Sequence, residues 1–111
     1  MNSRRQARME HFFAEETSRF LIGERVRGVF VTVTRAELLK EAGGLIVFVT
    51  VLPENKEKGV FEKLKKSAGR LRAYLSNALQ GRAVPEIKFE IDIGEKNRAK
   101  IDDLIAESRS S

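Results

Sequence analysis

The feature that most constrains the fold of this chain is the stretch from residue 61 to residue 79, FEKLKKSAGRLRAYLSNAL. Its apolar residues recur every three or four positions, which predicts the buried stripe of an amphipathic helix. The stripe comprises Phe61, Leu64, Ala68, Leu71, Leu75, Ala78 and Leu79. Glycine is less favourable than alanine in a helix by about 1 kcal/mol. We therefore expect Gly69 to break this stretch into two helices that meet at Ala68-Gly69.

A strand with one buried face is predicted directly after this helical stretch. Gly81 is a natural helix terminator, and Pro85 favours extended backbone at the residue before it. Apolar residues then alternate with charged ones, as in a strand that is buried on one side only. The apolar positions are Ile87, Phe89, Ile91 and Ile93.

The rest of the chain adds two strands and two helices. A helix with a partly aromatic face is expected to end near Ile22. Val29–Thr34 and the apolar Leu45–Leu52 are predicted as strands that pair antiparallel. Arg35–Ala42 resembles a short helix or helical turn between them, and Asn97–Ser108 a last helix.

This order of elements predicts an α+β fold. Helices must cover one face of a three-stranded mixed sheet, because three strands alone cannot enclose a core, so we expect a two-layer sandwich. The length of 111 residues fits one domain, which we place at residues 1–108, followed by a disordered tail at 109–111.

Positive charge is concentrated on the central helices. The formal net charge is +5, and residues 53–82 hold eight Lys or Arg against three Asp or Glu. The cations that lie off the apolar stripe, toward solvent, are Lys63, Lys65, Lys66, Arg70 and Arg72. Such a concentrated field suggests an anionic partner, nucleic acid first among them. A solvated helix face that keeps the protein soluble is the alternative, and charge alone leaves both open.

Catalytic chemistry finds little support. The chain has no cysteine and only one histidine, His11, so it predicts no metal site, no cofactor and no nucleophilic triad. Glu90 and Asp92, and the adjacent Asp102 and Asp103, fall on polar faces where carboxylates are solvated. The phenylalanines fall mostly on apolar stripes, so we do not assign them to base stacking, which requires exposure.

No membrane attachment is predicted. No apolar run approaches the ~20 residues that cross a bilayer, and no apolar signal-peptide core follows the basic N-terminus. We therefore expect a cytoplasmic protein.

Two helices joined at a glycine resemble the KH fold, in which a GXXG loop between two helices approaches the nucleic-acid backbone. Here the loop reads Ser67-Ala68-Gly69-Arg70, so the full GXXG is absent, and the strand-strand-helix-helix-strand order is that of type II. The chain is similar to the ribosome-binding factor A family, in which an Ala-Gly kink replaces this loop. The likeness rests on LKKSAGRLR at 64–72, RAVPEIKFEID at 82–92, RAKIDDLIAE at 98–107, and the arginine-led opening helix with Arg8, Phe13 and Glu16. The segment Thr34–Gly44 is a few residues longer than the family pattern.

The resemblance implies a non-enzymatic, monomeric assembly factor with no small-molecule substrate. Such factors bind the immature 30S subunit, contact its 16S rRNA near the decoding region, assist late rRNA maturation, and often serve cold adaptation. Candidate rRNA-binding residues of first rank are Arg4, Arg5, Arg8, Lys63, Lys66, Gly69, Arg70 and Arg72. Lys65, Arg82 and Lys88 are of second rank. Gly69 would let backbone approach closely, and the cations would neutralise phosphate.

Two other functions fit the same residues. One is a generic KH-like RNA- or DNA-binding module that acts elsewhere. The other is a protein-interaction domain that docks through the aromatic first helix or through Thr34–Gly44, with the charge incidental.

Overall fold

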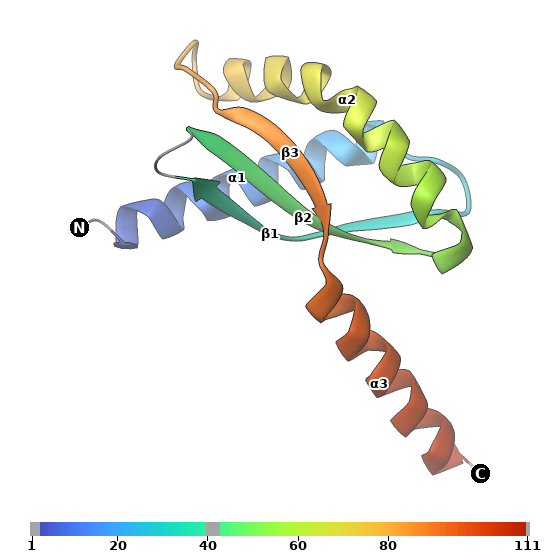
Figure 1. Ribbon diagram of the computed structural model, residues 1–111. Helices are drawn as coiled ribbons and strands as arrows, with labels where there is room; N and C mark the ends of the chain where they lie inside the picture. Colours follow the sequence, from blue (N-terminus) through green and yellow to red (C-terminus); the bar gives the residue numbers. More distant parts are fainter. Residues whose placement is uncertain (1–2, 40–42, 111) are drawn as a thin grey trace.

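The computed structural model describes residues 3–39 and 43–110 as three helices and a three-stranded mixed sheet, which confirms the predicted α+β class. In chain order the elements are α1 (Ser3–Gly23), β1 (Phe30–Leu39), β2 (Gly44–Leu52), a 3-10 turn (Glu54–Lys56), α2 (Glu57–Ala78), β3 (Glu86–Ile91) and α3 (Ile93–Ser110). α1 and α2 lie together on one face of the sheet, whereas α3 leaves the body of the molecule at the end of β3 (Figure 1).

The strands lie in the order β1-β2-β3, with β2 in the centre. β1 pairs antiparallel to β2, from Phe30 opposite Leu52 to Leu39 opposite Gly44, and β3 pairs parallel to β2. The register of β1 shifts between Val33 and Arg35, which is a bulge in an edge strand. The antiparallel pairing predicted for the first two strands is therefore confirmed.

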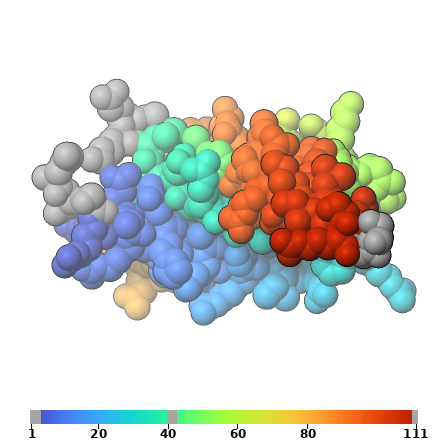
Figure 2. Space-filling model, turned by 90° about the horizontal axis from the view of Figure 1, so that it is seen from below, coloured from blue at the N-terminus to red at the C-terminus, as the bar shows by residue number. Residues whose placement is uncertain are grey.

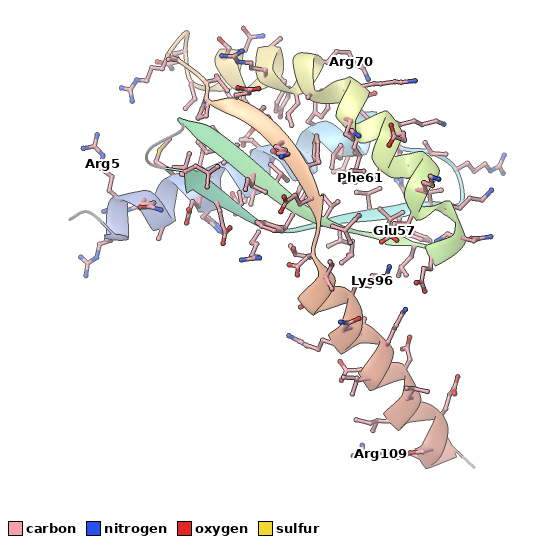
Figure 3. The ribbon with its side chains drawn as sticks, in the orientation of Figure 1. Arg5, Glu57, Phe61, Arg70, Lys96 and Arg109 are labelled. Atoms are coloured by element: carbon pink, nitrogen blue, oxygen red, sulfur yellow. The ribbon has the colours of Figure 1, made fainter. Side chains whose placement is uncertain are left out.

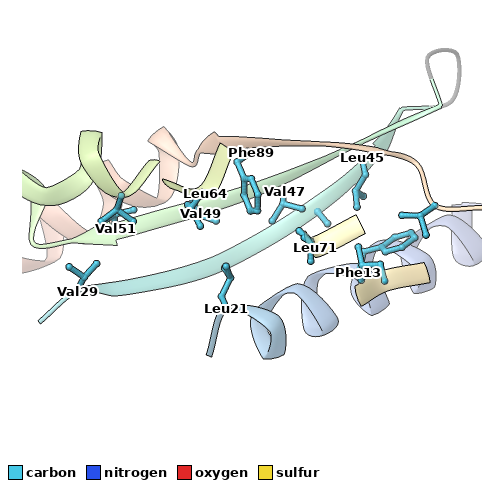
Figure 4. Close-up of a cluster of buried hydrophobic side chains, with 14 residues drawn as sticks. Phe13, Leu21, Val29, Leu45, Val47, Val49, Val51, Leu64, Leu71 and Phe89 are labelled. Atoms are coloured by element: carbon cyan, nitrogen blue, oxygen red, sulfur yellow. The ribbon is translucent and has the colours of Figure 1, made fainter. Parts of the chain in front are cut away.

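The core lies between the sheet and the two covering helices (Figure 4). Alternate residues of β2 point into it, because successive side chains of a strand point to opposite faces. The helical stripe predicted from residue 61 onward supplies the other side through Leu64, Leu71 and Leu75, whereas Ala78, predicted on the same stripe, is exposed. The fully buried side chains are Phe13, Thr17, Leu45, Val47, Val49, Leu71 and Leu75.

The aromatic face of α1 packs inside the protein. Phe13 is buried, and the ring centroids of Phe20 and Tyr74 lie 5.5 Å apart between α1 and α2. The Tyr74 hydroxyl donates a hydrogen bond of 3.1 Å to Glu16. Burial, and then this contact with Glu16, raise the pKa of Tyr74. The alternative in which the aromatics of the first helix dock a partner is therefore wrong.

The short helix predicted at Arg35–Ala42 is also wrong over its described part. β1 continues to Leu39, and Ala36 is buried on the core face. Pairing with β2 overrides the helix propensity of this segment, because each residue gains a ladder partner and Ala36 gains a place in the core. Residues 40–42, the rest of the predicted turn, lie outside the described residues.

The two helices predicted on either side of Gly69 are one helix, α2, which is continuous through Ala68-Gly69. Burial of Leu64, Leu71 and Leu75 against the sheet spans this position on both sides, so the packing outweighs the modest propensity cost of glycine. Figure 1 shows that α2 bends along its length as it crosses the sheet.

The last helix begins four residues earlier than predicted and includes Gly94. Asp92 precedes it, and the Asp92 carboxylate accepts a hydrogen bond of 3.0 Å from the backbone N–H of Glu95, as an N-cap does. Ile93, expected on the buried strand face, is instead in α3 and 66% exposed. The helix also continues through Arg109 and Ser110, which were predicted as part of the tail.

Candidate nucleic-acid interface

The predicted binding residues fall into separate groups. Arg4, Arg5 and Arg8 are exposed on the first turns of α1, and the other candidates lie on or beside α2. Figure 3 shows Arg5 at the start of α1, well apart from Arg70 in the middle of α2. Because α1 begins far from the middle of α2, the tertiary structure does not bring the arginines of residues 4–8 to the lysines of α2.

Within α2 the cations divide between two sides of the helix. Lys63, Lys66 and Arg70 follow each other at spacings of three and four residues, so they form one row, which borders α1. Lys65 lies on the other side, where its Nζ is 3.4 Å from Glu62 and 5.7 Å from the centre of the Phe61 ring. The side of α2 that carries Lys63, Lys66 and Arg70 therefore holds more positive charge than the side that carries Lys65.

Two of the predicted arginines already have partners inside the protein. Arg70 donates hydrogen bonds of 2.9 Å and 2.6 Å to the Glu24 carboxylate. Arg72 donates one of 3.1 Å to the carbonyl oxygen of Val84, which holds the chain that enters β3. Lys63 and Lys66 are exposed and have no carboxylate within 4.0 Å among the described residues. These two lysines are thus the cations of α2 most available to phosphate.

A groove of about 480 Å³ lies beside this row, between the C-terminal half of α1, the loop at 24–29, the start of β1 and α2. We call it the α1–α2 groove. Its inner wall is apolar and buried, formed by Leu21, Val29, Val60 and Leu64. Its cationic lining residues are Arg25, Lys63, Lys66 and Arg70, and Glu24 is its carboxylate. The cavity is therefore apolar inside and positively charged around its edge.

The prediction from sequence missed Arg25 and Arg27, which follow α1 directly. Arg25 lines the α1–α2 groove, and both residues line a smaller hollow that adjoins it. Both are exposed and without an ion pair among the described residues. The only signal in the sequence is their position between Gly23 and Gly28, which is typical of a loop. The packing of α1 on α2 is what brings Arg25 to the same groove as Lys63 and Lys66.

Gly69 and Arg82 are placed on the surface. Gly69 is exposed on α2, and a Cβ added there would meet no atom within 4 Å. Arg82 is exposed in the turn between α2 and β3, after Gly81, whose φ of 84° is the left-handed conformation that favours glycine. Neither residue lines the α1–α2 groove.

Ion pairs anchor the base of α3 to the start of α2. Lys96 Nζ lies 2.9 Å from Glu57 and 3.3 Å from Glu54, and Lys100 Nζ lies 3.1 Å from Glu54 (Figure 3). The hydrogen bond to Glu57 is the largest cause that raises the pKa of Lys96. Beyond this anchor α3 projects from the body, and Figure 2 shows it standing in front of the sheet and α1.

The prediction that the Asp92 carboxylate is solvated is wrong, because its side chain is only 12% exposed and accepts hydrogen bonds from other parts of the protein. Thr34 Oγ1 donates to it over 2.6 Å, in addition to the cap at Glu95. The Thr34 hydrogen bond, followed by the one from Glu95, lowers the pKa of Asp92. An ionised carboxylate that accepts two hydrogen bonds at a strand–helix junction is suited to holding α3, not to transferring protons.

Within residues 3–39 and 43–110, no group of three or more His, Cys, Asp or Glu side chains could hold a metal ion. No described helix is long and apolar enough to cross a membrane.

These observations define a small KH-like α+β domain in which one continuous helix, α2, stands where the predicted order had two, with a row of exposed cations along this helix. Residues 5–105 match the family model described as Ribosome-binding factor A, and the chain therefore belongs to this family. It is 35% identical to ribosome-binding factor A of Synechococcus sp. (strain CC9902) over 96 residues, which covers 82% of this chain and 72% of that protein.

Two solved structures have a similar fold. The crystal structure of ribosome-binding factor A from Thermus thermophilus matches with a TM-score of 0.68 at 23% identity, and covers 78% of this chain and 94% of that one. A homology model of the Thermus thermophilus factor, as fitted into a cryo-electron-microscopy map of a 30S–RbfA complex, matches with a TM-score of 0.60 at 26% identity, and the match covers 78% of this chain and 89% of that one.

Proposed function

We propose that this protein is a non-enzymatic assembly factor that binds the immature small ribosomal subunit as a monomer and assists late maturation of 16S rRNA near the decoding region, including during growth in the cold. The observation that carries the proposal is membership of the ribosome-binding factor A family over residues 5–105. A Thermus relative of the same fold has been fitted into a map of its complex with the 30S subunit. As such a factor the protein would act in the cytoplasm, where the subunits assemble.

The charge distribution supports rRNA as the direct ligand. Lys63 and Lys66 are exposed without a carboxylate partner among the described residues, so each can neutralise a phosphate without first breaking an ion pair. To bind a phosphate, the Arg70 guanidinium would have to contact it alongside Glu24 or break its ion pair with Glu24. Contacts of this kind read the shape and phosphate spacing of RNA and carry little sequence information.

Arg4, Arg5 and Arg8 form a second candidate surface, because they too are exposed and unpaired among the described residues. They lie at the start of α1, whereas Lys63 and Lys66 lie beside its C-terminal half, so a single short RNA helix need not contact both groups. We propose that they hold a separate rRNA segment. Lys65, Gly69, Arg72 and Arg82 would lie along the outer side of α2 and its C-terminal turn.

Co-sedimentation with immature small subunits tests this function. The wild-type protein is expected to migrate with free small subunits and to be absent from translating ribosomes. Charge reversal of Lys63 and Lys66 to glutamate is expected to weaken this binding and to make its salt dependence shallower by about one unit per lost phosphate contact. Reversal of Arg98 and Arg109 on α3 is the matched control, since it changes the net charge equally.

A wild-type protein that remains in light fractions would refute the assignment to ribosome assembly. If it still binds RNA oligonucleotides at low salt, the generic KH-like module is the better description. If Lys63→Glu/Lys66→Glu binds subunits as wild type does, the rRNA surface lies elsewhere, with Arg4, Arg5 and Arg8 the next to be changed.

A further inference from the structure

The outer half of α3, residues 101–108, carries an apolar face that nothing in the chain covers. Ile101, Leu104 and Ile105 lie three and four positions apart, so they share one side of the helix, and they are 57%, 63% and 45% exposed. The ion pairs of Lys96 and Lys100 hold only the base of α3, and every residue from 97 to 109 is exposed. Because helices in proteins owe most of their stability to the packing of an apolar face, a partner that covers this face would stabilise α3.

This half of α3 is also acidic. Residues 101–108 include three carboxylates and no Lys, Arg or His. At helical spacing, Asp102 and Glu107 fall on either side of the apolar face. Within the described part of the chain, neither Asp102 nor Asp103 forms an ion pair. A surface that fits this face should therefore be apolar inside and positively charged at its edge.

The α1–α2 groove has this composition. Its inner wall is apolar, and Ile22 and Val26, which also line it, are 65% and 39% exposed. Arg25, Lys63 and Lys66 supply positive charge, and the carboxylate that lines the groove already has an arginine partner. Its volume of about 480 Å³ is large enough to receive side chains of a partner. Apolar surface and charge therefore both match the outer half of α3.

The helix α3 cannot reach the groove of its own chain. The ion pairs of Lys96 and Lys100 fix its base at the start of α2, and Figure 1 shows the helix pointing away from α1 and α2. The groove lies on the face of the sheet that α1 and α2 cover. Only the α3 of another copy could therefore enter it.

We propose that the α1–α2 groove receives the outer half of α3 from a second copy of this chain, with Ile101 and Leu104 against its apolar wall and Asp102 toward Lys63 and Lys66. The inference goes beyond the proposed function and does not depend on it. The same two lysines are proposed to bind rRNA, so the docked helix and rRNA would exclude each other, and the subunit would hold a monomer. Because the contact joins two different surfaces, it gives a dimer if two copies exchange helices and longer chains if they do not.

Sedimentation velocity of the full chain over a range of concentrations tests the proposal. Wild type is expected to self-associate, less so as salt is added. Ile101→Ala/Leu104→Ala is expected to weaken this association at least about tenfold, the lower end for loss of a buried leucine side chain. Since alanine is the best helix former, lost helix propensity could not explain that result.

Leu39→Ala/Leu52→Ala is the matched control for exposed apolar surface. Both leucines are exposed on the sheet, at 41% and 60%, and neither lines the groove. This variant is expected to associate as wild type does. Weaker association would assign the contact to the sheet face that no helix covers and would overturn the proposal. Thermal unfolding shows whether each variant has folded.

A mixture of two variants identifies the surfaces that meet. Lys63→Glu/Lys66→Glu keeps α3 but places carboxylates at its own groove, and Ile101→Ala/Leu104→Ala keeps the groove but lacks the apolar face of α3. Each alone is expected to be monomeric, whereas the mixture is expected to form a complex of one copy of each. Arg82→Glu/Lys88→Glu changes the net charge equally outside the groove and is expected to self-associate as wild type does.

Three results would overturn the proposal: a wild type that stays monomeric at every concentration, self-association of Lys63→Glu/Lys66→Glu equal to that of wild type, or a mixture that forms no complex. Parallel sedimentation with small subunits separates this failure from that of the proposed function. A monomeric wild type that binds small subunits removes only the α3 contact. A wild type that self-associates through α3 but stays in light fractions removes only the ribosomal function.

Discussion

Replacement of Gly69 by alanine is expected to stabilise the protein, although Gly69 lies in the segment that most resembles a family motif. Gly69 is inside the continuous helix α2 and is exposed, and outside the local helix backbone no atom lies within 4 Å of the position that a Cβ would take. Alanine would thus add no clash and would gain the helix propensity that glycine lacks, about 1 kcal/mol. For a domain of this size that gain corresponds to a rise in Tm of about 4 °C.

Gly59→Ala is the matched control, because Gly59 is also exposed in α2 with no atom within 4 Å of an added Cβ. Both variants are expected to unfold at higher temperature than wild type when followed by circular dichroism, Gly59→Ala by less because it lies in the first turn of the helix. A lower Tm for Gly69→Ala alone would show that residue 69 needs a conformation other than the helical one, and would refute this reasoning.

The same pair of variants separates stability from RNA contact. If the RNA backbone approaches α2 closely at Gly69, as we propose, Gly69→Ala is expected to weaken subunit binding while it raises Tm, and Gly59→Ala is expected to leave binding unchanged. Equal subunit affinity of the two variants would deny Gly69 any role beyond its place in the helix. Because stability and binding move in opposite directions, damage to the fold could not be mistaken for loss of a contact.

Three further predictions concern the junctions that hold the helices. Asp92→Ala removes the cap of α3 and the Thr34 contact, and urea unfolding at pH 7 is expected to show a loss of about 1–2 kcal/mol. Since the pKa of Asp92 is lowered in the folded state, its ionised form stabilises the fold above the usual pKa of about 3.9. The difference in unfolding free energy between wild type and Asp92→Ala should therefore shrink as pH falls through the folded pKa. A difference that stays unchanged in acid would contradict the assignment. Tyr74 is the one tyrosine in a chain without tryptophan, and phenolate absorbance is expected to show that it titrates above its usual pKa of about 10. Glu16→Gln should lower this titration midpoint, and an unchanged midpoint would refute the contact. Because the folded pKa is raised, the stability that the neutral phenol contributes is lost as pH rises through the folded pKa. Lys96→Met should speed amide hydrogen exchange in α3 while β2 keeps its protection, and unchanged exchange in α3 would show that its ion pairs do not anchor it.

The shape of the α1–α2 groove depends on the packing of the hydrophobic core. Leu21, Val29 and Leu64 belong to the hydrophobic core and at the same time form the apolar wall of the α1–α2 groove. The groove is therefore built on the packed interface of α1, α2 and β1, and its geometry should persist as long as that core is intact.

Local sequence pattern was sufficient for the class of fold and for much of the core. The spacing of Leu64, Leu71 and Leu75 predicts their burial because an α-helix brings positions three and four apart onto one face. The alternation at Phe89 and Ile91 predicts the inward face of β3 for the corresponding reason in a strand. These predictions succeed because the period of side chains within one helix or strand already decides which of them share its buried face.

Predictions failed where contacts between elements outweighed local preference. The segment at 35–39 is a strand because β2 supplies its hydrogen-bonding partners, and α2 runs through Gly69 because the sheet supports it on both sides. Ile93 left the expected strand because Asp92 caps a helix at that point. The sheet that supports α2 at Gly69 is distant in sequence, whereas β2 and Asp92 lie near the residues that they affect but act through pairing and capping that local propensity does not include.

The sequence by itself determined that a basic helix would lie exposed over a mixed sheet, since periodicity and charge are properties of single elements. It did not determine which cations act together. Only the packing of α1 on α2 brings Arg25 to Lys63 and Lys66, separates them from Arg4, Arg5 and Arg8, and ties Arg70 to Glu24. Sequence could not predict this grouping, because the distances between side chains from different elements exist only once the core has closed.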